Sequence, residues 1–269
     1  MTWAMKTLTY NLTKKNEEVL LYLIADCHIG SEHFNEPKLR EVLDEIMEQP
    51  NAYAILNGDL IDNATKSSVS FDYDGLTPSA SLGLCLQLFK PLADAGKILA
   101  INTGNHENRS KKDVDLDPTA ILAQALGIEK AYSRTMSVLF LTMEGKKNHN
   151  IVFSVMAYHG NGGGVRIGSK ANKVEDMAKV MACDVYCMSH VHTPMTFKED
   201  YLIADGTHGV VRPATRQFVI SNSFLNYGGY SEEKAYTPTT ISVPKIHLCT
   251  RRIRKNGLDR IEKYTFCEV

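Results

Sequence analysis

The sequence predicts an α/β protein in which buried strands alternate with amphipathic helices. Apolar runs of strand length recur between helical patterns through the first two-thirds of the 269 residues, and the part after residue 197 is rich in strand patterns. Five of the predicted strands stop at Asp, Asn or His side chains. Because ligands of α/β sheets bind beyond the carboxyl ends of the strands, we expect the functional site at that edge.

Each predicted element follows from the spacing of its apolar residues. One helical segment has apolar residues at i, i+3, i+4, i+7 and i+8 and begins with Pro37, which suits a first helical turn. Asp117 and Gly127 supply the start and stop signals of another helix, and Pro91 is expected to disturb a weaker one. Strands are predicted at 19–25, 52–56, 97–102, 136–143, 151–157, 184–188, 217–221, 245–249 and 260–266, and helices at 37–48, 79–95, 117–126 and 171–181.

The sequence shows no internal repeat, low-complexity segment or Pro/Ser-rich linker. We therefore expect one domain over residues 1–269, with the functional motifs within 26–192 and the β-rich part 197–269 completing the fold. The composition, 43% hydrophobic and 23% charged, is that of a soluble globular protein and excludes disordered, collagen-like and coiled-coil chains. The net charge of −1 gives no overall attraction to nucleic acid or anionic membranes, so only a local basic patch can provide one.

Targeting signals are absent from the sequence pattern. The longest apolar run spans seven residues, 19–25, whereas a membrane-spanning helix needs roughly 20. Residues 1–15 lack the basic start, apolar core and cleavage site of a secretory signal. The six cysteines form no C-x-x-C pair, which favours buried free thiols over disulfides. We predict a cytoplasmic protein with no membrane contact, and the sequence leaves its oligomeric state open.

Seven polar residues at strand ends are of the types that bind metals. Asp26 and His28 stand at i and i+2 after a strand, so both side chains point to one side, and His190 and His192 repeat this spacing. Mixed oxygen and nitrogen ligands suit Mn, Fe, Zn or Ni better than Ca or Mg, and the lack of thiolates argues against a closed structural zinc site. The set has two carboxylates, one amide oxygen and four imidazoles, from Asp26, His28, Asp59, Asn105, His159, His190 and His192.

The number of these ligands predicts the chemistry. Seven are too many for one tetrahedral ion and fit two ions that share a carboxylate. Two metals roughly 4 Å apart can hold a bridging hydroxide and bind the oxygens of an in-line phosphoryl displacement. Hydrolysis of a phosphate ester by attack of that hydroxide is therefore the expected reaction.

Five ordered motifs give the sequence a family resemblance. They are Asp26-Cys27-His28, Gly58-Asp59-Leu60-Ile61-Asp62, Gly104-Asn105-His106-Glu107, His159-Gly160 and Ser189-His190-Val191-His192. In this order they resemble the motifs of the calcineurin-like metallophosphoesterases, over about two-thirds of the chain. The resemblance implies a four-layer α/β/β/α sandwich with a dimetal site at one edge.

The resemblance also implies a role for each motif residue. The first metal takes Asp26, His28, Asp59 and His192, and the second takes Asp59, Asn105, His159 and His190, with Asp59 bridging both. His106 binds no metal and donates a hydrogen bond or proton to the substrate or leaving oxygen. Asp62 matches the carboxylate that orients this histidine and keeps it protonated.

Two departures from the family pattern narrow the substrate class. Asn63 and Thr103 stand where protein Ser/Thr phosphatases of the superfamily carry arginines that grip phosphate, so a protein phosphatase is not expected. Ser189 replaces the usual glycine, a change that we expect to leave the ligands unaffected. The short Gly-Asp-x-x-Asp and His-x-His motifs look more like those of the phosphodiesterase and DNA-repair exonuclease branch of the superfamily, or of small phage-encoded relatives.

The expected function is therefore a dimetal phosphoesterase, with two divalent ions, Mn first and Fe, Zn or Ni as alternatives. The first hypothesis is a phosphodiesterase that acts on nucleic acid or a nucleotide; the alternatives are a small-molecule phosphomonoesterase and a metal-binding scaffold without turnover. Three basic clusters are present: Arg109 with Lys111 and Lys112, Arg166 with Lys170 and Lys173, and Arg251 and Arg252 with Arg254 and Lys255. The first two flank motif segments and are candidate contacts for a polyanion. Arg109, three residues after His106, is the best single candidate for binding substrate, together with Asn105.

Overall fold

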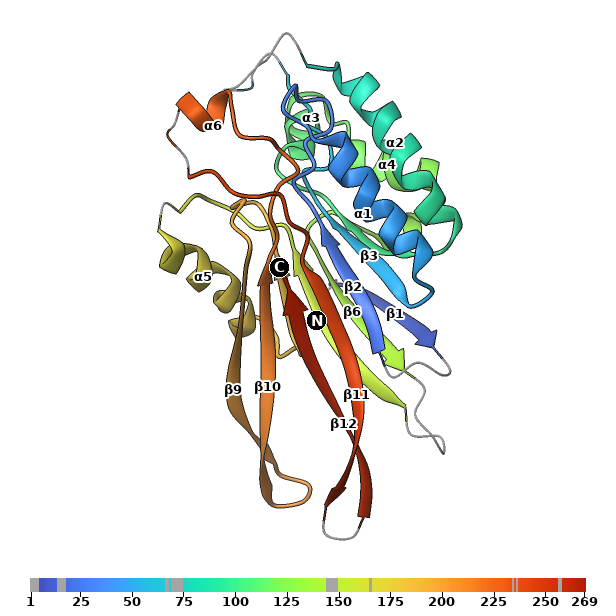
Figure 1. Ribbon diagram of the computed structural model, residues 1–269, viewed down its shortest axis with the longest axis vertical. Coiled ribbons are helices and arrows are strands. Elements are labelled where there is room, and N and C mark those ends of the chain that lie inside the picture. Colours follow the sequence, from blue (N-terminus) through green and yellow to red (C-terminus); the bar gives the residue numbers. More distant parts are fainter. Residues whose placement is uncertain are drawn as a thin grey trace.

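The structure is a computed structural model that describes residues 5–13, 18–65, 68, 75–143, 150–164, 166–233, 235, 237–255 and 258–269. The described residues form two six-stranded sheets that pack face to face, with helices on both outer faces (Figure 1). This arrangement confirms the four-layer α/β/β/α sandwich.

The first sheet has a parallel centre and an antiparallel edge. Its strand order is β12-β11-β2-β3-β4-β5, and β2 to β5 pair in parallel whereas β11 and β12 run antiparallel to their neighbours. The strands are β2 (Glu18–Ile24), β3 (Ala52–Asn57), β4 (Ile98–Asn102), β5 (Tyr132–Ser133), β11 (Lys245–Lys255) and β12 (Leu258–Glu268). The helices α1 (Glu36–Glu48), α2 (Pro78–Asp94) and α4 (Pro118–Leu126) cover its outer face.

The second sheet has the order β1-β6-β7-β8-β10-β9. Its strands are β1 (Lys6–Thr13), β6 (Met136–Met143), β7 (Ile151–Tyr158), β8 (Val185–Met188), β9 (Met195–Asp205) and β10 (Val210–Ile220). The helix α5 (Ile167–Asp176), followed by a 3-10 turn over Met177–Lys179, covers the outer face of this sheet. The shorter helices α3 (Glu107–Val114) and α6 (Tyr230–Glu233) and a 3-10 turn at Glu129–Ala131 lie in the connections.

Three apolar layers hold the sandwich together. Leu23, Ile55 and Val155 belong to the layer between the two sheets, where burial on both faces explains the uninterrupted apolar runs of the central strands. A second layer lies between the first sheet and α1, α2 and α4. In the third, Val174 and Met177 of the α5 segment pack on the second sheet.

The predicted helix ends agree with the observed ones where capping residues mark them. The Asp117 side chain accepts a hydrogen bond from the Ala120 N–H at the start of α4, and Gly127 ends the helix with φ +73°. Pro91 lies inside α2, which nevertheless continues to Asp94. Because proline removes only one backbone donor near the end of this helix, the expected disturbance does not end it.

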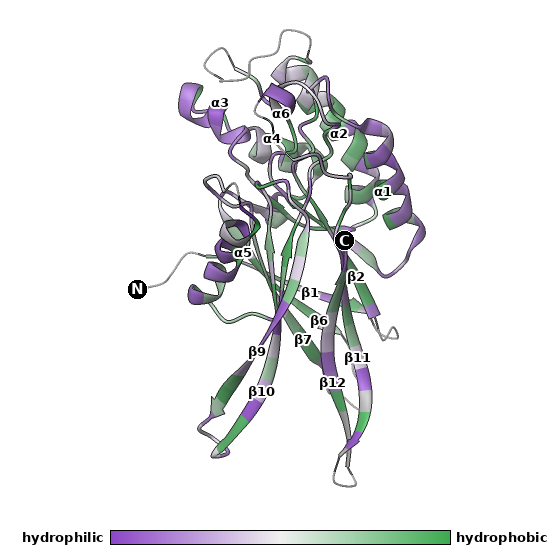
Figure 2. Ribbon diagram, turned by 60° about the vertical axis from the view of Figure 1, so that its left-hand side comes forward, coloured by the Kyte–Doolittle hydropathy of each residue, from purple (hydrophilic) through white to green (hydrophobic). Residues whose placement is uncertain are grey.

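The outer strands differ most from the prediction. The strands β1 and β9 and the helix α3 were not predicted, and β10, β11 and β12 are longer than their predicted cores. The β9–β10 and β11–β12 hairpins project from the body as two arms (Figure 2). Exposed Leu202 and Val211 lie near the tip of the first arm. The described part of the chain contains no helix that is long and apolar enough to cross a membrane.

Candidate metal centre and catalytic residues

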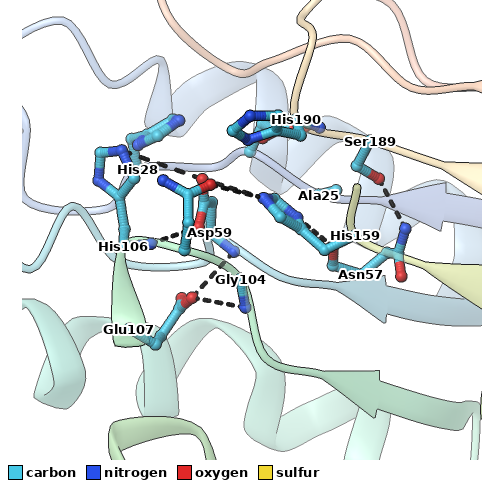
Figure 3. Close-up of polar contacts among 12 residues, drawn as sticks. Ala25, His28, Asn57, Asp59, Gly104, His106, Glu107, His159, Ser189 and His190 are labelled. Carbon is cyan, nitrogen blue, oxygen red and sulfur yellow. Dashed lines mark hydrogen bonds and ion pairs between the residues drawn. The ribbon is translucent and has the colours of Figure 1, made fainter. Parts of the chain in front are cut away.

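The seven predicted ligands come together where the carboxyl ends of central strands of the two sheets meet. Figure 3 shows His28, Asp59, His159 and His190 among them. The first sheet contributes Asp26 and His28 after β2, Asp59 after β3 and Asn105 after β4; the second contributes His159 after β7 and His190 and His192 after β8. Most are buried, whereas Asn105 is exposed and His190 and His192 are half-buried. The site is therefore open to solvent on one side.

The backbone is strained at most of these ligands. Asp26, His28 and Asp59 have φ values of +50°, +49° and +50°, and His190 and His192 have +72° and +46°. Residues other than glycine rarely adopt positive φ, and each such residue costs about 1–3 kcal/mol. Strain of this kind persists only where surrounding contacts enforce it. The fold therefore holds these side chains in fixed directions although the backbone conformation at each residue is unfavourable.

The first ligand group gathers around His192. Its Nε2 lies 3.2 Å from Asp26 Oδ1 and 3.3 Å from His28 Nε2. The ligand atoms of Asp26, His28 and His192 lie within 4.8 Å of one another. Two imidazole nitrogens and a carboxylate oxygen that converge in this way form a donor set that fits a divalent ion such as Mn, Fe or Zn.

The second ligand group gathers around His159. Its Nε2 lies 3.2 Å from Asp59 Oδ2 and 3.1 Å from Asn105 Oδ1, and the His190 ring lies 5.3 Å away, centroid to centroid. His159 Nδ1 donates to the Asn57 carbonyl at 2.7 Å, which turns Nε2 toward Asp59. A metal-binding histidine is usually oriented by such a bond at its other nitrogen, so this group also fits a metal.

The charges of the site shift the pKa values of its imidazoles in both directions. Burial works against a charged imidazole, but the Asp59 carboxylate outweighs it and raises the pKa of His159 to about 10. Burial would also raise the pKa of Asp59, yet His159 and His106 hold it well below its usual range. Burial, assisted by neighbouring imidazoles, lowers the pKa of both His28 and His190, which favours the neutral form that binds metals.

A further cluster of polar side chains lies beside the two ligand groups and consists of His106, Asp62 and Arg109. His106 Nδ1 lies 2.8 Å from the Asp62 carbonyl and 3.3 Å from its carboxylate, and Arg109 donates to His106 Nε2 at 3.0 Å and to the Asp62 carbonyl at 3.2 Å. Burial opposes protonation of His106, but Asp59 and Asp62 outweigh it and raise its pKa. The Asp62 carboxyl also lies 3.6 Å from His28 Nδ1, so it faces both histidines.

Glu107 is a buried residue of the third motif to which the sequence assigned no role. Its two carboxylate oxygens accept hydrogen bonds from the backbone N–H groups of Asp59, Leu60, Ile61 and Gly104, at 2.7–3.2 Å. Burial and the nearby Asp59 raise its pKa, while backbone donors act in the opposite direction. Glu107 therefore connects the loop that carries Asp59 to the turn that carries Asn105.

The residues at the two departures are buried. Asn63 donates to the His106 carbonyl at 2.7 Å and accepts from the Ser110 hydroxyl at 2.9 Å, so it supports the loop rather than facing substrate. Thr103 is buried at the end of β4. The Ser189 hydroxyl accepts a hydrogen bond from Asn57 Nδ2 at 2.8 Å. Neither Asn63 nor Thr103 can replace a phosphate-gripping arginine.

Two of the three basic clusters lie against the site. Lys170 donates to the Val191 carbonyl at 3.2 Å, between the two histidines of the last motif, and Lys173 donates to the Asn161 carbonyl at 2.6 Å, just after His159. Arg109 lies on the opposite side, at His106. The third cluster lies along β11, where Arg251 pairs with Glu262, in an arm that Figure 2 shows far from α3.

Comparison with known proteins agrees with this site. The family described as calcineurin-like phosphoesterase matches residues 20–194, so the chain belongs to that family. The family match and the clustered ligand groups together support binding of divalent metal at this site. No curated protein matches the sequence.

Two solved structures are similar to the chain at low identity. Vacuolar protein sorting 29 from Cryptosporidium parvum is 15% identical with a TM-score of 0.43, and the match covers 94% of this chain and 100% of that one. The nuclease MPE of Pseudomonas putida is 13% identical with a TM-score of 0.32, over 91% of this chain and 87% of that one.

Proposed function

We propose that this protein is a dimetal phosphodiesterase that acts on nucleic acid or a nucleotide. The observation that carries the proposal is the juxtaposition of two buried metal-ligand groups with the His106–Asp62–Arg109 cluster at one open edge. The metal would be Mn first, with Fe, Zn or Ni as alternatives. We also propose that the protein acts in the cytoplasm.

The ligands divide into two sets that share Asp59. Asp26, His28, Asp59 and His192 would hold one ion, and Asp59, Asn105, His159 and His190 would hold the other. When bound, such ions neutralise charge on the phosphoryl oxygens and activate a water molecule for in-line attack. The protein contributes the fixed, partly dehydrated frame, in which the strained backbone already aims the side chains.

His106 would act on the leaving oxygen of the ester. In the structure Arg109, which can only donate, occupies the Nε2 side of its ring. We expect the substrate phosphate to draw the Arg109 guanidinium onto its oxygens, which leaves Nε2 free to carry a proton. Asp62 holds the Nδ1 side and stabilises the charged imidazole, as required of a general acid.

Cations on both sides of the site support a substrate longer than one phosphate group. Among the residues that the structure describes, no carboxylate pairs with Arg109, Lys170 or Lys173. Their positive charge is therefore available to an anion that extends past the metals. A phosphodiester strand or nucleotide fits this distribution better than a small monoester.

The test compares a bis-aryl phosphate with a mono-aryl phosphate, using metal-stripped protein titrated with Mn²⁺. We expect the diester to be preferred and its hydrolysis to appear as the second ion binds. Preference for the monoester would replace the proposal with a small-molecule phosphomonoesterase. Two bound ions without turnover of either ester, or of DNA, RNA and cyclic nucleotides, would favour a scaffold.

The same proposal predicts how binding depends on salt. Metal-stripped protein should bind labelled single-stranded DNA more weakly as salt rises, and Lys173→Gln should reduce the slope of log K against log salt by about 0.7. Lys179→Gln is the control, because Lys179 is exposed and paired with Asp176. Binding that does not change with salt would contradict a nucleic-acid substrate.

A further inference from the structure

The second ligand group rests on a buried chain of hydrogen bonds. Asn57, the last residue of β3, donates to the Ser189 hydroxyl at 2.8 Å and to the Tyr158 carbonyl at 3.0 Å. Its side-chain oxygen accepts from Asn102 Nδ2 at 2.9 Å, and Asn102 also donates to the Ala157 carbonyl at 3.2 Å. These hydrogen bonds therefore tie the ends of β3 and β4 to the ends of β7 and β8, across the two sheets. Figure 3 shows the bond from Asn57 to Ser189.

Ser189 is the first residue of a strained turn around a ligand. The Val191 N–H donates to the Ser189 carbonyl at 2.8 Å, which closes a three-residue turn with His190 at its centre and φ +72°. A three-residue turn with positive φ at its centre is rare and strained, so contacts at its ends must hold it. The Ser189 N–H bonds to the His159 carbonyl at 3.0 Å, and its hydroxyl is the anchor to Asn57.

Asn57 acts on both histidines of the second group. Its carbonyl receives the Nδ1 hydrogen bond of His159, and its side chain fixes the start of the turn that carries His190. Asn57, Ser189 and His159 are fully or almost fully buried, so solvent cannot replace a lost partner among them. Any shift of Asn57 or Ser189 would change the separation of the two imidazoles.

We propose that Asn57 and Ser189 are positioning residues that set the affinity of the second metal through their hydrogen bond. The inference rests on the proposed two-metal function and deepens it. It assigns a purpose to Ser189, the residue at which the last motif departs from the usual glycine. It also distinguishes the two ions, because this pair bonds directly within the second group, whereas the first group contacts the turn through the His190 N–H, which donates to Asp26 Oδ2 at 3.0 Å.

The test is a titration of metal-stripped protein with Mn²⁺, in which bound ions are counted by equilibrium dialysis. We expect Ser189→Ala to weaken the second ion about tenfold or more, the scale for groups that orient metal ligands. The first ion should weaken less, because it is reached through the hydrogen bond from the His190 N–H to Asp26. Ser189→Gly, which also frees the backbone, should weaken the second ion further. Ser133→Ala is the matched control, because it removes a buried hydroxyl that bonds to the Met136 carbonyl away from both groups.

The outcomes separate the inference from the proposed function. Unchanged affinities in Ser189→Ala, or equal weakening of both ions, would overturn the positioning role and leave only a structural one. A wild-type chain that binds two ions but hydrolyses no ester would contradict the proposed function while the difference between the two sites still stands. A wild-type chain that never binds a second ion would overturn both.

Discussion

His106 lies between groups that pull its protonation in opposite directions. Asp62 and Asp59 favour the charged imidazole, whereas Arg109 presents a second positive charge at its Nε2. A residue in this position can exchange a proton when an anion takes the arginine away. The charges of Asp59, Asp62 and Arg109 therefore decide whether the His106 imidazole is protonated.

Replacing His106 tests this role directly. We expect His106→Ala to retain both metals, because the groups around His192 and His159 do not include His106, and to lower kcat for the diester by about 10² or more. His106 also lies within ligand distance of His28 and Asp62, so the metal count of this variant tests that third grouping as well. The measurement is steady-state hydrolysis with metal content determined on the same sample. His208→Ala is the control, since His208 is an exposed residue beside Asp205. Full activity in His106→Ala would exclude the proton-donor role.

At the scale of elements, two strand-to-loop turns interlock in the site. A Cβ atom on Gly58 would lie 2.7 Å from the Gly104 backbone, and one on Gly104 would lie 2.1 Å from Asp59 Oδ1. The ends of β3 and β4 therefore approach so closely that only glycine fits between them. This contact fixes the position of Asp59 relative to Asn105, the residue after Gly104.

The interlocked turns give a prediction about alanine substitutions. Gly104→Ala should abolish binding of both ions, because the added methyl group must displace the shared Asp59 ligand. In contrast, Gly83→Ala, in an exposed part of α2 with open space around it, should raise the free energy of unfolding by about 0.5–1 kcal/mol. Metal counting and urea unfolding measure the two effects. Normal metal binding by Gly104→Ala would contradict the proposed packing.

The sequence predicts those elements and residues whose signals are local. The central strands are uniformly apolar and the predicted ligands follow them directly, so periodicity and motif order identify seven side chains that lie together in the structure. Their role as metal ligands stays a prediction. The strands β1 and β9 lie at sheet edges, where one face stays exposed and the apolar pattern fades. Apart from the bond between Glu107 and Gly104, the contacts of Glu107 and Asn57 described above join residues 45 or more positions apart, and no local pattern records them.

At the scale of the whole molecule, the six cysteines belong to the apolar layers and not to the site. All six thiols are free, and five of them are buried. Burial raises the pKa of each thiol, to about 11 for Cys183 and Cys249 and well above the ordinary value for Cys27 and Cys85. The folded chain therefore keeps these protons at a pH where the unfolded chain loses them.

This difference predicts that alkali destabilises the protein. Unfolded thiols ionise from about pH 8.5, so above that pH the unfolded state binds fewer protons and the free energy of unfolding falls, by at most about 1.4 kcal/mol per pH unit for each buried thiol. Urea unfolding at pH 7.5 and 9.5 measures the loss. Cys85→Ala should be less stable at pH 7.5 but lose less on going to pH 9.5. An equal loss in both proteins would contradict the assignment.

The division of the ligands between the sheets has a consequence for assembly of the chain. Asp26, His28 and Asp59 belong to one half of the sandwich, and His159, His190 and His192 belong to the other. Neither half alone contains all the proposed ligands of either ion. Each metal would therefore bind fully only after the two halves have docked. Metal capture would then report the last step of folding, and loss of metal would precede the separation of the sheets.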